Sequence, residues 1–244
     1  MLGTVQRHGR VSQMVMRQEA YAGDQLVNRV GFWAAVLATV FSVAFVITAV
    51  LSSLVVPVAD WQGIEAYAAA FRTLDVIPVV PPLLLAPAFV VLMASVHRCV
   101  ADERKVLSLS ALSFSVVYAA IIWIIDYVQL TVVRQNILGG VTDGLALWAM
   151  PNMRSLFFAL EAVAYGFMSL STLVAAPLFG REGVERWVRW LFLANGFIGI
   201  GGVVAYAFGH VTVVFLGLAL WCIEFPIATG LLAVLFRRAQ REVG

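Results

Sequence analysis

The sequence predicts an all-helical integral membrane protein, a bundle of six transmembrane helices with both termini in the cytoplasm. The 244-residue chain is 62% hydrophobic and only 12% charged, and its mean hydropathy is +0.93. This composition is typical of membrane proteins. Six apolar segments are near the roughly 20 residues that a helix needs to cross a bilayer. A soluble bundle is excluded because these segments lack the polar stripe that its helices carry.

The six segments follow one another along almost the whole chain. They run from Val30 to Val56, Val76 to Val96, Leu107 to Val133, Ser155 to Leu178, Trp187 to Phe208 and Val211 to Phe236. The second segment contains four prolines, each of which removes a backbone donor and predicts a locally loosened helix. The connection at Gly209 and His210 is so short that the last two segments are expected to form an antiparallel hairpin. The longest connection, Arg134 to Arg154, is expected to be a plain connector rather than a lid.

The distribution of basic residues predicts the orientation. Of the 16 Lys and Arg residues, 13 fall before the first segment, in the second and fourth connections, at the start of the fifth segment, and in the tail. Only Arg72, Arg134 and Arg154 fall on the other side. Because positive charge is retained in the cytoplasm, both termini are expected there. The outline is typical of many bacterial multi-pass proteins, so we expect the inner (plasma) membrane of a bacterium.

The chain divides into a lead-in, a membrane domain and a tail. Residues 1–29 have no apolar core of signal-peptide length and form either a weakly amphipathic surface helix or a disordered lead-in. Residues 30–236 make the six-helix domain, and residues 237–244 a basic cytoplasmic tail. We expect the bilayer as the main partner, and the sequence does not indicate an oligomeric state.

Several classes of function are excluded by the inventory of residues. The net charge of +2 follows from the basic cytoplasmic side and gives no reason to expect nucleic acid. Cys99 and Cys222 form no CxxC pair, and the three histidines are scattered, so neither a metal nor a cofactor is expected. No lysine lies mid-membrane to hold retinal, and no phosphate-binding loop is present.

Three of the six segments each carry one carboxylate: Asp126 in the third, Glu161 in the fourth and Glu224 in the sixth. None of the segments has a Lys, Arg or His near its centre. Ionisable groups at membrane depth are costly and usually functional. A single buried acid can also be purely structural, forming a hydrogen bond between helices. Because there are three acids and no base, a purely structural role is less favoured for all three together.

Helical spacing places these acids on polar faces that are expected to converge on one pocket. The faces are Ser115, Ile122, Asp126 and Gln129; Glu161, Tyr165, Ser169 and Thr172; Asn195, Gly199, Gly202 and Tyr206; and Gly217, Trp221, Glu224 and Ala228. Burial disfavours the charged form of an unpaired carboxylate unless donors stabilise it. Candidate donors are Tyr127, Gln129, Tyr165, Asn195 and Trp221, with Arg134 as a partial counter-charge.

Two classes of function remain open. The first is a protein that binds or transports a proton, a cation or a small apolar or cationic molecule. The second is an intramembrane enzyme that uses a carboxylic acid for isomerisation or cyclisation of a lipid or isoprenoid. Glu224 is the preferred functional acid because Pro226, two residues later, predicts a kink that exposes carbonyl groups beside it. No catalytic residue is assigned.

Overall fold

The computed structural model describes residues 2–55 and 61–243, and the side chains of residues 24–52 and 61–241. Within these ranges every regular element is helical. The longer helices are α1 (Leu2–Val55), α3 (Val80–Cys99), α4 (Lys105–Val128), α6 (Leu156–Ala175), α7 (Gly183–Ala207) and α8 (Val211–Val243). Shorter elements are α2 (Ile64–Ala70), η1 (Thr73–Val79), η2 (Asp102–Arg104), the π-helix η3 (Gln129–Val133), α5 (Arg134–Leu138), η4 (Leu145–Leu147) and η5 (Ala176–Leu178).

The described chain contains six helical stretches long and apolar enough to cross a membrane, which confirms the predicted segments. They are Asp24–Ser52, Thr73–Cys99, Asp102–Leu138, Leu156–Leu178, Gly183–Ala207 and Val211–Arg241. The third is longer than predicted at both ends, and the sixth begins at Val211 as predicted but continues beyond Phe236 to Arg241. α1 is one helix from Leu2 to Val55. The side chains of residues 1–23 lie outside those described, so the surface-helix hypothesis for residues 1–29 stays a prediction.

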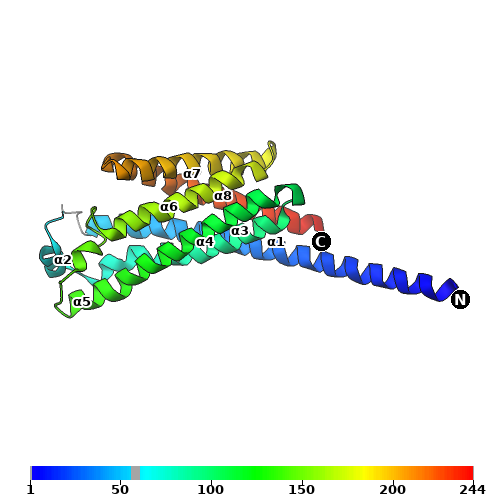
Figure 1. Ribbon diagram of the computed structural model, residues 1–244, viewed down its shortest axis with the longest axis horizontal. Coiled ribbons are helices and arrows are strands. Elements are labelled where there is room, and N and C mark those ends of the chain that lie inside the picture. The colour runs from blue at the N-terminus through cyan, green and yellow to red at the C-terminus, as the bar shows by residue number, and fades with distance from the viewer. Residues whose placement is uncertain (1, 56–60, 244) are drawn as a thin grey trace.

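The six long helices form a closed ring in chain order. Each packs against the next, from α1 to α3, α4, α6, α7 and α8, and α8 packs back against α1. They run side by side along the long axis of the molecule, with α2 and α5 at one end (Figure 1). The short connections from α3 to α4, α6 to α7 and α7 to α8 favour this arrangement of antiparallel neighbours. The centre of the ring is therefore shared by side chains from all six helices.

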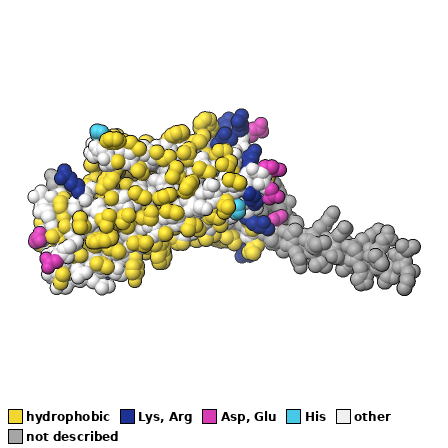
Figure 2. Space-filling model, in the orientation of Figure 1, with side chains coloured by type: hydrophobic (Ala, Val, Ile, Leu, Met, Phe, Trp, Pro, Cys, Tyr) yellow, Lys and Arg dark blue, Asp and Glu magenta, His cyan; other side chains and the backbone are white. Residues whose placement is uncertain are grey.

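The surface of the bundle is apolar between two polar ends. Val40, Ile124, Phe197, Leu216 and Ile223 are examples of large hydrophobic side chains that are more than half exposed. Figure 2 shows this apolar band, with most of the Lys and Arg residues gathered beyond one end of it. A band of this size is expected to face lipid rather than water.

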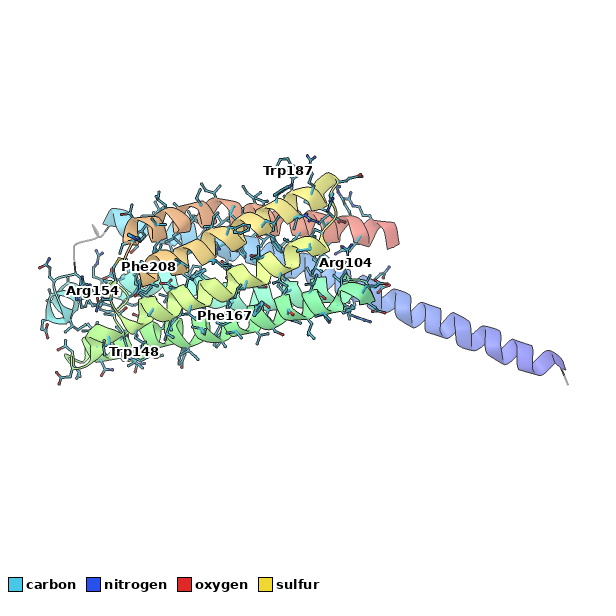
Figure 3. The ribbon with its side chains drawn as sticks, turned by 45° about the horizontal axis from the view of Figure 1, so that its top comes forward. Arg104, Trp148, Arg154, Phe167, Trp187 and Phe208 are labelled. Carbon is cyan, nitrogen blue, oxygen red and sulfur yellow. The ribbon has the colours of Figure 1, made fainter. Side chains whose placement is uncertain are left out.

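We name the two ends by their composition. The basic end holds Arg104 and Trp187, and the loop end holds Trp148, Arg154 and Phe208 (Figure 3). The three basic residues predicted for the outer side, Arg72, Arg134 and Arg154, all belong to connections at the loop end. The arrangement of the helices therefore separates the basic residues as the sequence predicts, and the assignment of the basic end to the cytoplasm stays a prediction.

The prolines affect the second and sixth spans differently. The second begins as the 3-10 helix η1, which contains Pro78, and α3 then has proline in its first turn. Proline is tolerated there because a first-turn N–H has no partner within the helix. α8 continues through Pro226, and the Thr229 hydroxyl donates to the Phe225 carbonyl (3.0 Å). The regular helix beyond Pro226 gives no support to the predicted exposure of carbonyl groups beside Glu224.

Five aromatic rings fill the middle of the bundle in a closed cycle. The distances between ring centroids are 5.9 Å for Phe89–Tyr118, 5.8 Å for Tyr118–Tyr165, 5.4 Å for Tyr165–Trp221, 5.1 Å for Trp221–Phe225 and 5.7 Å for Phe225–Phe89. Besides neighbouring helices, these contacts join α8 to α3 and to α6, which are not its neighbours in the ring. Three of the contacts are edge-to-face and Trp221–Phe225 is stacked, and aromatic pairs in these two arrangements contribute about 0.5–1.5 kcal/mol each beyond the area they bury.

Glycines let α6 and α7 approach closely. A Cβ atom on Gly199 would lie 1.8 Å from Oγ and 2.8 Å from Cβ of Ser169, and one on Gly196 would lie 2.6 Å from Cβ of Leu173. By contrast, a Cβ on Gly201 or Gly202 would meet no atom within 4 Å. Small residues at helix interfaces commonly allow this close packing in membranes.

The first prediction concerns orientation. A reporter fused after Gly244 is expected in the cytoplasm, and one inserted between Gly139 and Gly144 on the opposite side, because the basic end should be retained inside. Activity of paired cytoplasmic and external reporters measures this. A tail reporter on the external side would contradict the orientation.

The second prediction concerns the contact between α6 and α7. Gly199→Ala is expected to destabilise the protein by about 1–3 kcal/mol, because the added methyl group overlaps Ser169. The unfolding midpoint in detergent measures the effect. Gly201→Ala is the matched control and should leave the midpoint unchanged or raise it. Combining Gly199→Ala with Ser169→Gly should restore it, and a stable single variant would show that the approach is not tight.

Candidate functional site

A cavity of about 120 Å³ lies between α6, α7 and α8, in the half of these helices nearer the loop end. Three of the four predicted polar faces contribute to its wall. α6 provides Glu161, Tyr165 and Ser169; α7 provides Gly199, Gly202 and Tyr206; and α8 provides Gly217 and Trp221. The cavity exists partly because glycines occupy positions where larger side chains would fill it.

The wall of the cavity is aromatic and contains one charged residue. Phe158, Tyr165, Tyr206, Phe215 and Trp221 supply rings. Glu161 is the carboxylate among the lining residues, which include no Lys, Arg or His in the described chain. Aromatic faces and a carboxylate together attract cations, the first through their quadrupoles and the second through its charge.

Trp221 connects the cavity with the five-ring core. Its side chain is 6% exposed, and its indole N–H has no hydrogen-bond acceptor among the described residues. The ring stacks on Phe225 at an interplanar angle of 16° and meets Tyr165 edge-on at 79°. The indole is therefore held in place on its inner side while it forms part of the cavity wall.

Asp126 is buried on α4, the helix that packs against α6 and so against the element that carries Glu161. Its side chain is 3% exposed, and one oxygen, Oδ2, has no hydrogen-bond partner in the part of the chain that the structure describes. Arg134, the expected counter-charge, lies eight residues further along and forms no ion pair with Asp126. The ion pair that the described residues form joins Arg72 to Asp75 at the loop end (3.4 Å).

Glu224 belongs to a chain of hydrogen bonds that lies one helical turn further from the loop end than the cavity. The Thr172 hydroxyl donates to Asn195 Oδ1 (2.8 Å), and Asn195 Nδ2 donates to Glu224 Oε1 (2.6 Å). All three side chains are buried, and Glu224 Oε2 has no partner among the described groups. Asn195 thus links α6 to α8 through α7. The preference for Glu224 as the functional acid is not tested by this geometry, which places Glu161 and not Glu224 in the cavity wall.

Two other predicted residues lie outside the cavity. Gln129 is buried, but its amide accepts from the Met150 N–H (3.3 Å) and donates to the Trp148 carbonyl, so it holds the long connection in place. Tyr127 is 57% exposed and faces away from Asp126. Consecutive helical side chains diverge by about 100°, so Tyr127 cannot share the face of Asp126.

The connections at the loop end pack over the end of the bundle nearer the cavity. Residues 61–71 and the long connection pack together around Ile64, Val133 and Leu145. The Tyr206 hydroxyl, in the cavity wall, donates to the Met153 carbonyl (3.0 Å). Burial and the nearby charge of Asp75 raise the pKa of Tyr67 to about 12, so this phenol stays protonated at physiological pH. The long connection is therefore fixed to the bundle at several points.

Comparison with known proteins does not assign the chain. No protein-family model matches the sequence, and neither a curated protein nor a solved structure matches it. Among the described residues no group of three or more His, Cys, Asp or Glu side chains is placed to hold a metal ion. The function must therefore be argued from the cavity and the acids around it.

The third prediction concerns Glu224. Glu224→Ala is expected to lower stability by about 1–3 kcal/mol, because Asn195 Nδ2 loses its acceptor in a buried position. Glu224→Gln keeps an oxygen for Asn195 and should leave the unfolding midpoint near that of the wild type. An alanine variant as stable as the glutamine variant would show that the bond does not support the fold.

Proposed function

We propose that this protein is a membrane carrier whose cavity between α6, α7 and α8 binds a small organic cation. The observation that supports this most is the position of Glu161, a lone carboxylate in an aromatic wall without a neighbouring base. A desolvated cation over an aromatic face gains about 2 kcal/mol or more. The carboxylate adds a charge partner that an apolar ligand would not need.

The size of the cavity limits the ligand. An apolar cavity of about 150 Å³ is large enough for benzene, so a space of about 120 Å³ suits a head group with few non-hydrogen atoms. Tetramethylammonium is the simplest probe with this size and charge. Longer chains on the nitrogen would have to leave through the mouth of the cavity.

A second candidate is the intramembrane enzyme acting on a lipid or isoprenoid. Phe215, which is 47% exposed on the apolar surface, also forms part of the cavity wall. An apolar molecule dissolved in the bilayer would therefore meet the cavity from the side. Incubation with an isoprenoid in lipid nanodiscs tests this candidate, because an isomerised product that disappears in Glu161→Gln would favour the enzyme.

The fourth prediction is that the purified protein binds tetramethylammonium and that Glu161→Gln weakens binding at least about tenfold, or about 1.4 kcal/mol. The reason is the loss of the charge partner from an apolar wall. Isothermal titration measures the affinity, and flux of the labelled cation into proteoliposomes measures transport. Equal affinity in the wild type and in Glu161→Gln would contradict the proposed site.

A matched pair of variants tests the location of the ligand. Gly202→Leu places a side chain in the cavity and is expected to abolish binding, whereas Gly201→Leu places the same side chain on the exposed surface of α7. Both positions have open space for a Cβ atom. The control should therefore fold and bind like the wild type. Loss of binding in both variants, or in neither, would contradict the assignment.

A further inference from the structure

We propose that the basic end of the bundle contains a second binding site, which takes a small amphiphilic carboxylate, that is, one carboxylate joined to an apolar group. The site is a cavity of about 350 Å³ between α1, α3, α7, α8 and the turn that joins α6 to α7. It lies at the opposite end of the bundle from the cation cavity. The proposal therefore does not depend on the proposed function.

The wall of this second cavity comes from elements that contact one another around it. α3 packs against α1, α1 against α8, and α8 against α7. Leu178 and Phe179, in the turn after α6, form the wall between α7 and α3, and Arg104 Nη1 donates to the Pro177 carbonyl in the same turn (3.3 Å). We therefore expect a ligand to enter from the end of the bundle rather than sideways from lipid. The volume is within the range of small-molecule pockets.

Arg238 supplies the positive charge of the second cavity. It lines the cavity, and its guanidinium forms neither an ion pair nor a hydrogen bond within the described part of the chain. By contrast, Arg189 Nη1 donates to the Phe179 carbonyl (3.4 Å), and the guanidinium of Arg237 lies 5.3 Å from the ring centroid of Phe32. A guanidinium is a planar fork of donors that fits the two oxygens of a carboxylate. Arg238 is therefore available to bind one.

Asn28 supplies a further donor. Its side chain is 8% exposed and lines the cavity. The Cys99 thiol lies 3.9 Å from Asn28 Oδ1, and the Gln240 amide donates to the Asn28 carbonyl (2.9 Å), which holds the end of α8 against α1. Asn28 Nδ2 has no acceptor among the described groups. A donor that is nearly buried and unused is costly unless a ligand or water accepts from it.

The rest of the wall is mainly apolar. Val96 and Phe236 are buried, and Leu235 is half-buried. Phe236 packs closely against α1, because a Cβ atom on Gly31 would lie 2.5 Å from Cε1 of its ring. An apolar group in contact with these side chains is removed from water, which is favourable. The wall therefore fits a ligand that has an apolar part as well as a negative charge.

The charges at this end favour a ligand with one negative charge. Glu185 also lines the cavity, and its Oε2 accepts from the Gly180 N–H. This carboxylate would repel a phosphate ester, which carries about two negative charges, more than a carboxylate. The segments 97–105, 180–189 and 237–244 contain nine Lys and Arg residues and five Asp and Glu residues. Their summed field still attracts an anion rather than a cation.

The fifth prediction is that octanoate protects Cys99 from alkylation. Cys99 is exposed and lines the cavity, and Cys222→Ala leaves it as the only thiol. Saturating octanoate is expected to slow the reaction with a maleimide at least about tenfold, because the bound ligand blocks access to the thiol. Mass spectrometry of the labelled protein measures the rate. Octylammonium, with the same chain and the opposite charge, and acetate, without the chain, should not protect at the same concentration.

Arg238→Gln and Arg237→Gln are a matched pair of variants. Both remove one guanidinium from an exposed position of α8, but that of Arg238 lines the cavity, whereas that of Arg237 lies over Phe32. Arg238→Gln should require at least about tenfold more octanoate for half protection, because it loses hydrogen bonds to a charged group. Arg237→Gln should behave like the wild type. Isothermal titration measures the same affinities without relying on the thiol.

Protection by octanoate that Arg238→Gln reduces and Arg237→Gln retains would support the site. Equal protection by octanoate and octylammonium, an equal loss in both variants, or a wild type that shows neither protection nor binding heat would overturn it. Weaker octanoate binding in Glu185→Gln would overturn it as well, because a site for a monocarboxylate does not need that acid. These measurements are independent of tetramethylammonium binding at Glu161, so either site can fail without the other.

Discussion

Polar side chains inside this bundle must find partners on other helices, because the outer surface is apolar and hydrocarbon offers no hydrogen bonds. This constraint orients four of the six helices. Asp126, Asn195 and Glu224 are all buried, and Asn195 joins α6 to α8 by accepting from one and donating to the other. The closed ring of helices brings these faces together, and the five aromatic rings fill the space that the polar groups leave.

The packing of α6 against α7 determines where the cavity lies. At Gly199, α6 and α7 approach so closely that a Cβ atom would overlap Ser169. One turn nearer the loop end, Gly202 has no neighbour within 4 Å of a Cβ position, and the helices leave room beside Glu161. Two glycines on one helix therefore have opposite roles, one allowing contact and the other leaving space. Glu161, which is half-buried, is thereby accessible to a ligand in the cavity.

Much of this arrangement follows from periodicity. The six spans and the inward position of Asp126, Asn195 and Glu224 could be predicted because hydrophobic length and helical spacing are local properties of the chain. The sixth span was predicted to run through Pro226 and does so, whereas the exposure of carbonyl groups that this proline was expected to cause stays a prediction. The π-helix after Asp126 was missed, since a bulge depends on packing rather than on residue type.

The choice among the three acids also needed the fold. In the sequence, Glu161 and Glu224 each occupy a polar face at similar spacing, and Pro226 made Glu224 the more distinctive residue. The partner of Glu224 is Asn195, 29 residues away, and such a pairing depends on the rotation of both helices. The partners of Gln129 could not be predicted for a related reason, because Trp148 and Met150 lie in a connection whose path has no periodic signal.

The central claim is that a cation binds beside Glu161, and its most direct test is an experimental structure with tetramethylarsonium. The arsenic atom gives an anomalous signal that locates the ion without relying on the shape of the density. The account predicts one strong peak between α6, α7 and α8, beside the Glu161 carboxylate and the face of Trp221, and no such peak in Glu161→Gln. A peak elsewhere in the bundle, for instance at Glu224, or an empty cavity at saturating ligand would contradict it.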